Sequence, residues 1–456
     1  MTTMRLALVL LLATGVAPAL AAPSQPLDQQ LAAVLAGHGF TGRIESTLEA
    51  RLGRHIDQKR ADLGRLLWFD SLIALNDDNS CSGCHSPTAG FGDTQPIAIG
   101  INNNGIVGPH RAGPRNQRRA PMVVNTAFFP TLMWNSRFAS LSGDPFDNSA
   151  GLKFPPPEGL GLSYLPQLLV AQAFIPPTER TEVAGFAFPG DNFAIRDEVL
   201  RRLNGSPAYR KQFGEVFPDV KAGAPITFDD FGLVIAEFEF SLVFADAPID
   251  RFARGERNAL TDSQKRGALV FFGKGRCVSC HAVSGQSNEM FSDFQEHVIG
   301  VPQVAPSFGN VTFDGPGANE DFGLEQVTFD PNDRYRFRTS PIRNVALQPT
   351  FMHNGAFTRL DDAIRHHLDV QASATSYRAA GLPPDLQGPT GPIEPVLARL
   401  DPLLATPILL TDEEFAQLVD FVRDGLLDPR AQPEHLKVLI PQALPSGRPT
   451  LQFEFP

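Results

Sequence analysis

Two five-residue stretches have the residue types and the spacing for redox chemistry. Both read Cys-x-x-Cys-His, at residues 81–85 and 277–281, and together they use all four cysteines of the chain. This is the attachment signature of a c-type haem, in which two thiols bond the vinyl groups and the adjacent histidine becomes the proximal iron ligand. The predicted attachment residues are Cys81, Cys84, Cys277 and Cys280, and the predicted proximal ligands are His85 and His281.

Two other chemistries use paired cysteines. The four thiols could form two disulfides, or they could together bind one zinc ion. A zinc site gives no reason for a histidine after the second cysteine of both motifs, and a redox dithiol would not be expected twice with that histidine. We therefore expect two covalently bound c-type haems as cofactors.

The composition is typical of a soluble globular protein. The chain has 456 residues, enough for two or three ordinary domains, with 42% apolar and 20% charged residues. The net charge of −11 and the lack of a long basic run exclude nucleic acid or an anionic membrane surface as an expected partner. Residues 111–119 contain four arginines. We interpret this segment as a solvated loop or as one that pairs with haem propionates.

The first residues have the pattern of a secretory signal. Arg5 supplies positive charge, residues 6–12 begin an apolar stretch, and residues 19–21 (Ala-Leu-Ala) match the small-x-small cleavage rule. We predict a signal peptide over residues 1–21 and a periplasmic location, with an uncleaved anchor as the alternative. Export fits the haem motifs, because c-type haem is attached outside the bacterial cytoplasm. No later stretch is long and apolar enough to span a membrane.

The two halves of the chain repeat one another around the motifs. Gly64 and Phe69 precede the first motif with the mutual spacing that Gly267 and Phe272 have before the second. The repeat indicates two homologous haem domains in tandem.

The repeat continues after each motif. Residues 125–141 and 344–360 share an Asn-x4-Pro-Thr pattern, followed by Asn, Phe and Leu at matching positions. In this alignment Trp134 and His353 occupy equivalent places.

We predict a mainly α-helical protein with two tandem cytochrome c-like haem domains and long irregular loops. Helical signals are clear in residues 62–70, 227–244 and 411–425. Residues 87–121 are rich in Gly, Pro and Asn and predict a long loop beside the first haem. The predicted organisation is a signal peptide at 1–21, an N-terminal domain at 22–255, a C-terminal domain at 256–435 and a tail at 436–456.

These features resemble the bacterial di-haem cytochrome c peroxidase family, which includes the MauG-type enzymes, over most of residues 62–425. The resemblance rests on the two haem motifs, on Trp134, and on residues 120–125 (Ala-Pro-Met-Val-Val-Asn), 339–347 (Thr-Ser-Pro-Ile-Arg-Asn-Val-Ala-Leu) and 351–355 (Phe-Met-His-Asn-Gly). It implies that the N-terminal haem reacts with hydrogen peroxide and that the C-terminal haem receives or relays electrons.

The resemblance also implies roles on the N-terminal side. Trp134 falls where the family has a tryptophan between the haems, which can relay an electron hole; a packed aromatic residue is the alternative. Family members that need reductive activation have a histidine sixteen residues after the motif histidine. This chain has Ile101 there, which cannot bind iron, so we expect an open, peroxide-accessible site. His110 is the rival ligand.

Peroxide cleavage needs a group that takes a proton from one oxygen and returns it to the other. Glu182 lies ten residues after Gln172, and the pair matches the family's catalytic glutamate and its glutamine. We therefore expect Glu182 to be the acid–base group. Glu179 is the rival, and a surface carboxylate without a catalytic role is the alternative.

On the C-terminal side, the resemblance places a second iron ligand at His367, where the family has Met or Tyr. A histidine in place of methionine should lower the reduction potential. His366 is the rival ligand, and His353 matches a family histidine that lies near the haem without binding iron.

The family usually holds a calcium ion between its domains. Thr339 and Pro341 match residues that donate backbone carbonyls to it. The family's asparagine before Ala120 is Arg119 here, and a cation at that place disfavours calcium.

The expected function is a periplasmic peroxidase that reduces hydrogen peroxide to water, with electrons from a small c-type cytochrome or a cupredoxin. A homodimer is compatible with this interpretation. One alternative is a MauG-like enzyme that stores two oxidising equivalents as paired ferryl haems and oxidises a partner protein or another substrate. The other is a non-enzymatic di-haem electron carrier, which predicts two six-coordinate haems and Glu182 away from iron.

Overall fold

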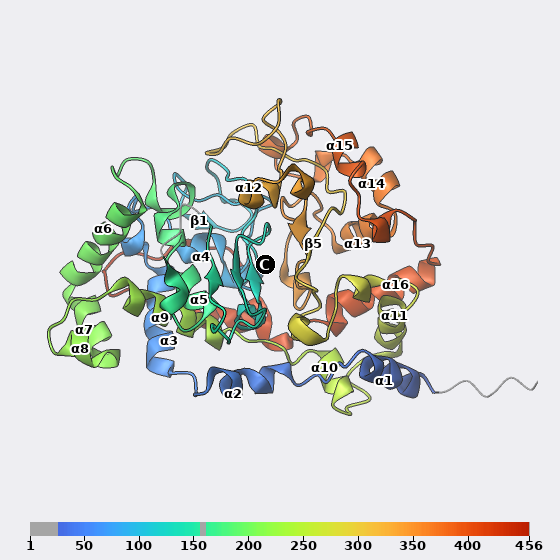
Figure 1. Ribbon diagram of the computed structural model, residues 1–456, viewed down its shortest axis with the longest axis horizontal. Helices are drawn as coiled ribbons and strands as arrows, with labels where there is room; N and C mark the ends of the chain where they lie inside the picture. Colours follow the sequence, from blue (N-terminus) through green and yellow to red (C-terminus); the bar gives the residue numbers. More distant parts are fainter. Residues whose placement is uncertain (1–25, 156–160, 456) are drawn as a thin grey trace, which may run out of the picture.

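The computed structural model describes residues 26–155 and 161–455, so the predicted signal peptide lies outside the described residues. The fold is mainly helical, as predicted, with long connecting segments between the helices (Figure 1). The helices of the first half are α1 Leu27–Gly37, α2 Leu48–Leu52, α3 Gln58–Phe69, α4 Cys81–Cys84, α5 Leu168–Gln172, α6 Asn192–Gly205, α7 Pro207–Val216, α8 Pro218–Lys221, α9 Phe228–Ser241 and α10 Pro248–Ala253. Those of the second half are α11 Asp262–Phe272, α12 Glu325–Thr328, α13 Leu360–Leu368, α14 Val370–Ser376, α15 Glu394–Leu397, α16 Asp412–Asp420 and α17 Pro433–Leu436.

The strands form three small sheets. They are β1 Ile106–Val107, β2 Thr131–Leu132, β3 Phe138–Ser140, β4 Leu152–Lys153, β5 Glu296–His297, β6 Phe337–Arg338 and β7 Gln452–Phe453. The pair β1–β7 is parallel, whereas β2–β3–β4 and β5–β6 are antiparallel. No helix among the described residues is long and apolar enough to cross a membrane.

Each half contains one close helix crossing that a glycine makes possible. In the N-terminal half α3 packs on α9, and in the C-terminal half α11 packs on α16. A Cβ on Gly64 would overlap the carbonyl oxygen of Val234, and a Cβ on Gly267 would overlap that of Gln417. The two glycines that correspond in the sequence repeat therefore make the same kind of contact.

Three of these four crossing helices, α9, α11 and α16, begin with a capping box. The side chain of the residue just before the helix accepts from the backbone N–H of the third helical residue, whose own side chain accepts from the backbone N–H of the residue before the helix. These pairs are Thr227 with Asp230, Thr261 with Gln264, and Thr411 with Glu414. The predicted helix at residues 411–425 is α16 followed by a π-helical turn at Phe421–Gly425.

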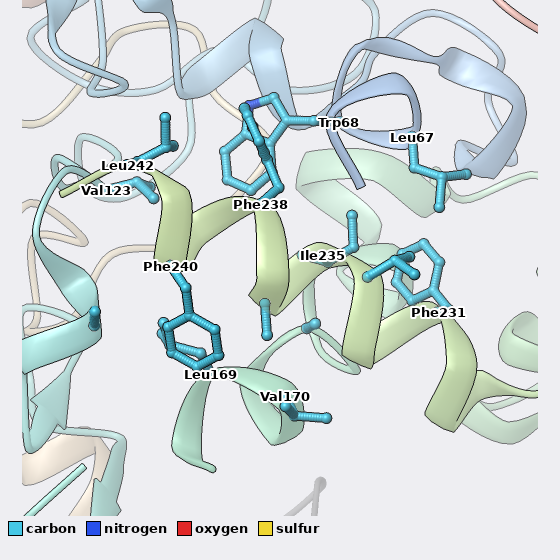
Figure 2. Close-up of a cluster of buried hydrophobic side chains, with 14 of the residues drawn as sticks. Leu67, Trp68, Val123, Leu169, Val170, Phe231, Ile235, Phe238, Phe240 and Leu242 are labelled. Atoms are coloured by element: carbon cyan, nitrogen blue, oxygen red, sulfur yellow. The ribbon is translucent and has the colours of Figure 1, made fainter. Parts of the chain in front are cut away.

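Helix α9 is the centre of the N-terminal core. Figure 2 shows it between side chains of α3 on one side and of α5 on the other. The rings of Trp68 and Phe238 pack edge to face with centres 5.5 Å apart, and Leu169 and Val170 of α5 are fully buried. Each such buried side chain contributes about 1.5–3 kcal/mol. This packing holds α3, which leads into the first haem motif, against α5.

The two ends of the chain each pack on the half that is distant in sequence. Leu31 and Leu35 of α1 belong to the same core as Phe271 of α11. Leu436 and Leu444 of the tail belong to the core of the N-terminal half, and β7 pairs with β1. The domain boundaries expected from the sequence stay a prediction, but the chain ends tie the two halves together.

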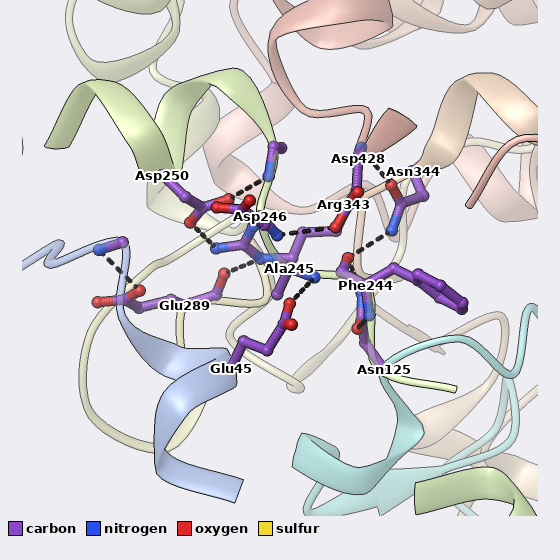
Figure 3. Close-up of polar contacts among 12 residues, drawn as sticks. Glu45, Asn125, Phe244, Ala245, Asp246, Asp250, Glu289, Arg343, Asn344 and Asp428 are labelled. Carbon is purple, nitrogen blue, oxygen red and sulfur yellow. Dashed lines mark hydrogen bonds and ion pairs between the residues drawn. The ribbon is translucent and has the colours of Figure 1, made fainter. Parts of the chain in front are cut away.

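A buried polar network joins the halves at the segment between them (Figure 3). Asn125 and Asn344, which correspond in the repeat, both donate from Nδ2 to the Phe244 carbonyl oxygen, at 3.0 and 2.9 Å. Arg343 forms a bidentate ion pair with Asp250, at 2.7 and 2.8 Å, and both side chains are fully buried. The two halves therefore have a fixed relative position.

Gly64→Ala and Gly267→Ala are each expected to lower the melting temperature of the haem-loaded protein. The new methyl group would meet a backbone oxygen, and overpacking of this kind costs about 1–3 kcal/mol. Circular dichroism measures the change. Gly205→Ala, at the exposed end of α6 where no atom lies within 4 Å of the new Cβ, is the control and should be neutral or slightly stabilising. Unchanged melting temperatures in both crossing variants would contradict the close packing.

Candidate haem sites

The two Cys-x-x-Cys-His motifs line two separate cavities. The first, of about 450 Å³, is bordered by Cys81, Cys84 and His85. The second, of about 220 Å³, is bordered by Cys277, Cys280 and His281. All four cysteines are free thiols. Because the pairs lie in different cavities, they cannot form one shared zinc site, and each cavity has the residues that would hold one c-type haem.

Both motif histidines are oriented as iron ligands require. The Nδ1 atom of His85 lies 3.3 Å from the Phe91 carbonyl oxygen, and that of His281 lies 2.9 Å from the Phe291 carbonyl oxygen. A carbonyl only accepts, so Nδ1 carries the proton and Nε2 keeps its lone pair for a metal. Burial lowers the pKa of both histidines to about 4, which keeps the rings neutral.

The second cavity has a second imidazole opposite the first. His367 lines it, and the ring centres of His281 and His367 are 6.3 Å apart. Two imidazoles on opposite faces of one metal ion have ring centres about 6 Å apart, since each metal–nitrogen bond is about 2 Å and the ring centre lies about 1 Å behind the nitrogen. The Nδ1 atom of His367 donates to the Ala363 carbonyl oxygen at 2.8 Å, which leaves Nε2 free.

The neighbouring His366 has a different environment. It is fully buried and does not border the cavity. Its Nε2 donates to the Ile299 carbonyl oxygen at 2.8 Å, and its Nδ1 lies 3.0 Å from the Ser373 hydroxyl. Both ring nitrogens therefore have protein partners. His353 borders the cavity, stacked on the Phe337 ring at 3.7 Å.

Among the described residues that border the first cavity, His85 is the one histidine. Ile101 is buried, and its backbone N–H donates to the Thr181 carbonyl oxygen at 3.2 Å. The rival ligand His110 lies on the surface, 2.9 Å from the Glu454 carboxylate. No imidazole faces His85 across this cavity among the residues that border it.

Glu182 and Gln172 both border the first cavity. Glu182 lies in the π-helical turn Arg180–Ala184, and Asn79 Nδ2 donates to its carbonyl oxygen at 2.8 Å. A Cβ on Gly100 would overlap this turn, so the preceding loop packs directly on it. The tight backbone packing fixes where the Glu182 carboxyl lies.

The electrostatic environments of the two candidate glutamates differ. The rival Glu179 forms an ion pair with Arg137 at 2.9 Å. Burial raises the pKa of Glu182, the Glu179 carboxylate raises it further, and the Arg137 guanidinium opposes both effects. The Glu182 side chain is partly accessible because it faces the cavity. Within the described residues it is thus a carboxyl group without an ion-pair partner, and its pKa is above the usual value, as expected for an acid–base group.

Trp134 borders both cavities. Its Nε1 donates to the Arg119 carbonyl oxygen at 2.9 Å, and its carbonyl oxygen accepts from the Arg338 backbone N–H at 2.8 Å. The indole is therefore held between the cavities by residues from both halves of the chain.

Sequence reasoning missed Glu239, which also borders the first cavity. It is 5% exposed, its Oε2 has no hydrogen-bond partner, and burial raises its pKa to about 8. The spacing of Phe231, Ile235 and Glu239 places one face of α9 toward the cavity. The spacing of four residues between these positions is the sequence signal that could have indicated Glu239 as a cavity residue.

The residues expected to hold calcium do not fit that ion. The Thr339 carbonyl oxygen accepts from the Ser292 hydroxyl at 2.7 Å and lies 3.4 Å from Nη1 of Arg338. The Pro341 carbonyl oxygen lies 3.4 Å from the Ser340 hydroxyl. A guanidinium group beside a candidate carbonyl ligand opposes a divalent cation.

Two haem-attachment motifs in two cavities of a mainly helical fold define a di-haem c-type protein. Residues 58–258 match the family model described as di-haem cytochrome c peroxidase. The chain is 29% identical over 321 residues to cytochrome c peroxidase Ccp of Escherichia coli (strain K12), covering 69% of this chain and 54% of that protein. It is 29% identical over 400 residues to the methylamine utilization protein MauG of Paracoccus denitrificans (strain Pd 1222), covering 84% of this chain and 92% of that protein.

The fold agrees with these sequence comparisons. A crystal structure of a MauG-like protein associated with microbial copper homeostasis superposes with a TM-score of 0.58 at 23% identity, covering 83% of this chain and 91% of the other. Over residues 58–258 and in these relatives, the chain is similar to the di-haem cytochrome c peroxidase and MauG proteins. The comparisons agree with the resemblance expected from the sequence, whereas the roles of individual site residues stay predictions.

Proposed function

We propose that this protein reduces hydrogen peroxide to water at the first cavity, with electrons that enter through the second. The observation that supports this most is the asymmetry of the cavities: His281 faces His367 across the second, whereas no imidazole faces His85 across the first. His281 and His367 would then hold the haem of the second cavity, which would supply electron transfer, whereas His85 would hold the haem of the first cavity, which would supply the reaction with peroxide.

The chain's own residues would then handle the protons. A haem bound in the first cavity supplies the iron that binds peroxide and delivers electrons to it. Glu182, as a carboxylate, takes a proton from one peroxide oxygen and returns it to the other, so that the leaving oxygen departs as water. Gln172, on the same cavity wall, orients the peroxide by hydrogen bonding. Two electrons and two protons complete the reduction of each peroxide to two water molecules.

Electrons would pass between the cavities through Trp134, which borders both. A small c-type cytochrome or a cupredoxin in the periplasm is the proposed donor. The second candidate function, oxidation of a partner protein, is supported by the match that covers 92% of a MauG protein. It uses the same two cavities and the same indole.

Electron paramagnetic resonance of the fully oxidised protein tests the proposal. We expect one high-spin ferric signal from the first cavity and one low-spin signal from the second. Hydrogen peroxide should then rapidly remove the high-spin signal, and a reduced cytochrome donor should be oxidised catalytically. Two low-spin signals that do not respond to peroxide would contradict the open site. Loss of both signals without catalytic oxidation of the donor would favour the protein-oxidising function.

A further inference from the structure

Two buried arginines lie between the two cavities. Five residues border both cavities: Arg119, Pro121, Met122, Trp134 and Arg338. The two arginines come from opposite halves of the chain, and each is only 4% exposed. They are therefore positive charges inside the protein, at the place where the two cavities approach each other.

Neither arginine forms an ion pair within the described part of the chain. Arg119 donates to the Thr350 carbonyl oxygen, to the Asp93 carbonyl oxygen at 3.2 Å and to Gln348 Oε1 at 2.7 Å, and its Nε has no partner. The buried Asp93 carboxylate attracts Arg119 electrostatically without forming an ion pair with it, and its two oxygens accept from the backbone N–H groups of Gln95 and Ala120, both at 2.9 Å.

Arg338 is in a similar situation. Its Nε donates to the Met133 carbonyl oxygen at 2.9 Å, and its Nη1 lies 3.4 Å from the Thr339 carbonyl oxygen. Glu296 attracts Arg338 electrostatically, but the two form no ion pair within the described residues. Burial lowers the pKa of Arg119 and of Arg338 to about 10, so both remain charged at neutral pH.

Among the other buried arginines of the described residues, Arg115 and Arg343 are paired with carboxylates, whereas Arg111 has only neutral acceptors. Arg115 contacts the Asp385 carboxylate, and Arg343 forms a bidentate pair with Asp250. Burying a charge is costly unless an opposite charge compensates for it. Arg119 and Arg338 differ from buried Arg111 in bordering both cavities, where an anion from outside the polypeptide can reach them, and guanidinium groups bind carboxylates especially well.

We propose that Arg119 and Arg338 form a carboxylate-binding site shared by the two cavities, which takes haem propionates in place of a bound divalent cation. This inference rests on the placement of the two haems proposed above. Each guanidinium adjoins both cavities, and the site thereby supplies positive charge where calcium would otherwise be needed. The same two residues hold Trp134 through its Nε1 and its carbonyl oxygen, so propionate binding and indole position are linked.

The first experiment measures the reduction potential of each haem in Arg119→Gln and Arg338→Gln. Loss of a nearby positive charge favours the oxidised iron, so the potential of the affected haem should fall. At a fixed applied potential, we expect the ratio of oxidised to reduced haem to rise tenfold or more. For a one-electron couple this corresponds to a fall of about 59 mV in the reduction potential of that haem. Arg115→Gln is the control, because Arg115 is equally buried but borders neither cavity, and it should leave both potentials unchanged.

The pattern of shifts identifies the carboxylate. If only the potential of the high-spin haem shifts, the arginines bind a propionate in the first cavity. If only the potential of the low-spin haem shifts, they bind a propionate in the second cavity. If both potentials shift, they bind propionates from both cavities. Unchanged potentials in both variants would overturn the proposal. Arg119→Lys and Arg338→Lys keep the charge and should keep potentials near those of the wild type. If the glutamine variants do not fold or do not retain haem, the lysine variants decide the matter, since a fall in either potential as large as that expected for the glutamine variants would overturn the proposal.

Elemental analysis and chelation test the absence of calcium. The haem-loaded protein should contain less than one calcium ion per chain, and EGTA should leave both paramagnetic signals and the potentials unchanged. One tightly bound calcium whose removal changes either signal would overturn this part of the proposal. Haem content and peroxide turnover of the wild type are measured separately, so failure of the proposed function is distinguished from failure of the arginine site.

Discussion

Glu182→Gln is expected to lower kcat for peroxide reduction about 10²–10⁴-fold, the usual loss when a general acid–base group is removed. Glutamine has nearly the same size and can still form hydrogen bonds, but it cannot accept the peroxide proton. The turn that holds this residue depends on backbone contacts with Asn79 and with the loop at Gly100, so the fold should be retained. Steady-state oxidation of a reduced cytochrome donor gives kcat, and the absorption spectrum confirms two haems per chain.

Glu179→Gln is the matched control, because Glu179 lies in the same segment but is paired with Arg137. Its kcat at the optimal pH should stay close to that of the wild type. A loss as large as that of Glu182→Gln would transfer the acid–base role to Glu179. Equal activity of Glu182→Gln and the wild type would exclude Glu182 from the chemistry.

The pH dependence of kcat/KM gives a second test of the same group. The base is active as a carboxylate, so activity should fall as the pH drops through the pKa of Glu182. Burial and the Glu179 carboxylate raise that pKa above 4.5, so the loss should occur at a higher pH than for an ordinary glutamate. Glu179→Gln removes a negative charge beside Glu182 and should move the acid limb to lower pH. An unmoved limb would show that another group titrates.

The features that the sequence predicted are those with local signals. The haem motifs specify their chemistry by spacing alone, and the capping box at Thr411 and Glu414 marks the start of α16 through residues three apart. The sequence repeat identified Gly64 and Gly267 as corresponding residues, because Gly64 and Phe69 have the same mutual spacing as Gly267 and Phe272. Each of the two glycines allows one close helix crossing. Glu182 and Gln172, which were paired by their spacing, both border the first cavity, and their roles there stay predictions.

The features that the sequence could not predict depend on contacts between distant segments. Nothing near Arg338 in the sequence indicates that β6 lies against Trp134 and brings a second guanidinium between the cavities. The sequence also does not indicate that α1, which lies within the predicted N-terminal domain, packs on α11 of the second half, because apolar residues alone do not specify which core they join. The choice between His366 and His367 likewise needs the direction of each side chain on α13.

His367→Met should raise the reduction potential of the C-terminal haem by on the order of 0.1–0.3 V, part of the roughly 0.8 V range that axial ligands span. The thioether is a weaker electron donor to ferric iron than imidazole, so it favours the reduced state. The Nε2 of His367 is free and its ring lies 6.3 Å from His281, which is the basis for choosing this residue. Redox titration followed by low-spin absorption measures the change.

His366→Gln is the control, because an amide can still donate to the Ile299 carbonyl oxygen that His366 Nε2 contacts. It should leave the low-spin signal and the potential of the C-terminal haem unchanged, even if the fold is less stable. If His366→Gln converts that haem to high spin while His367→Met does not change its potential, the ligand assignment is reversed. If neither variant alters the haem, its second ligand comes from another part of the chain, and the asymmetry that supports peroxide reduction at the first cavity loses its basis.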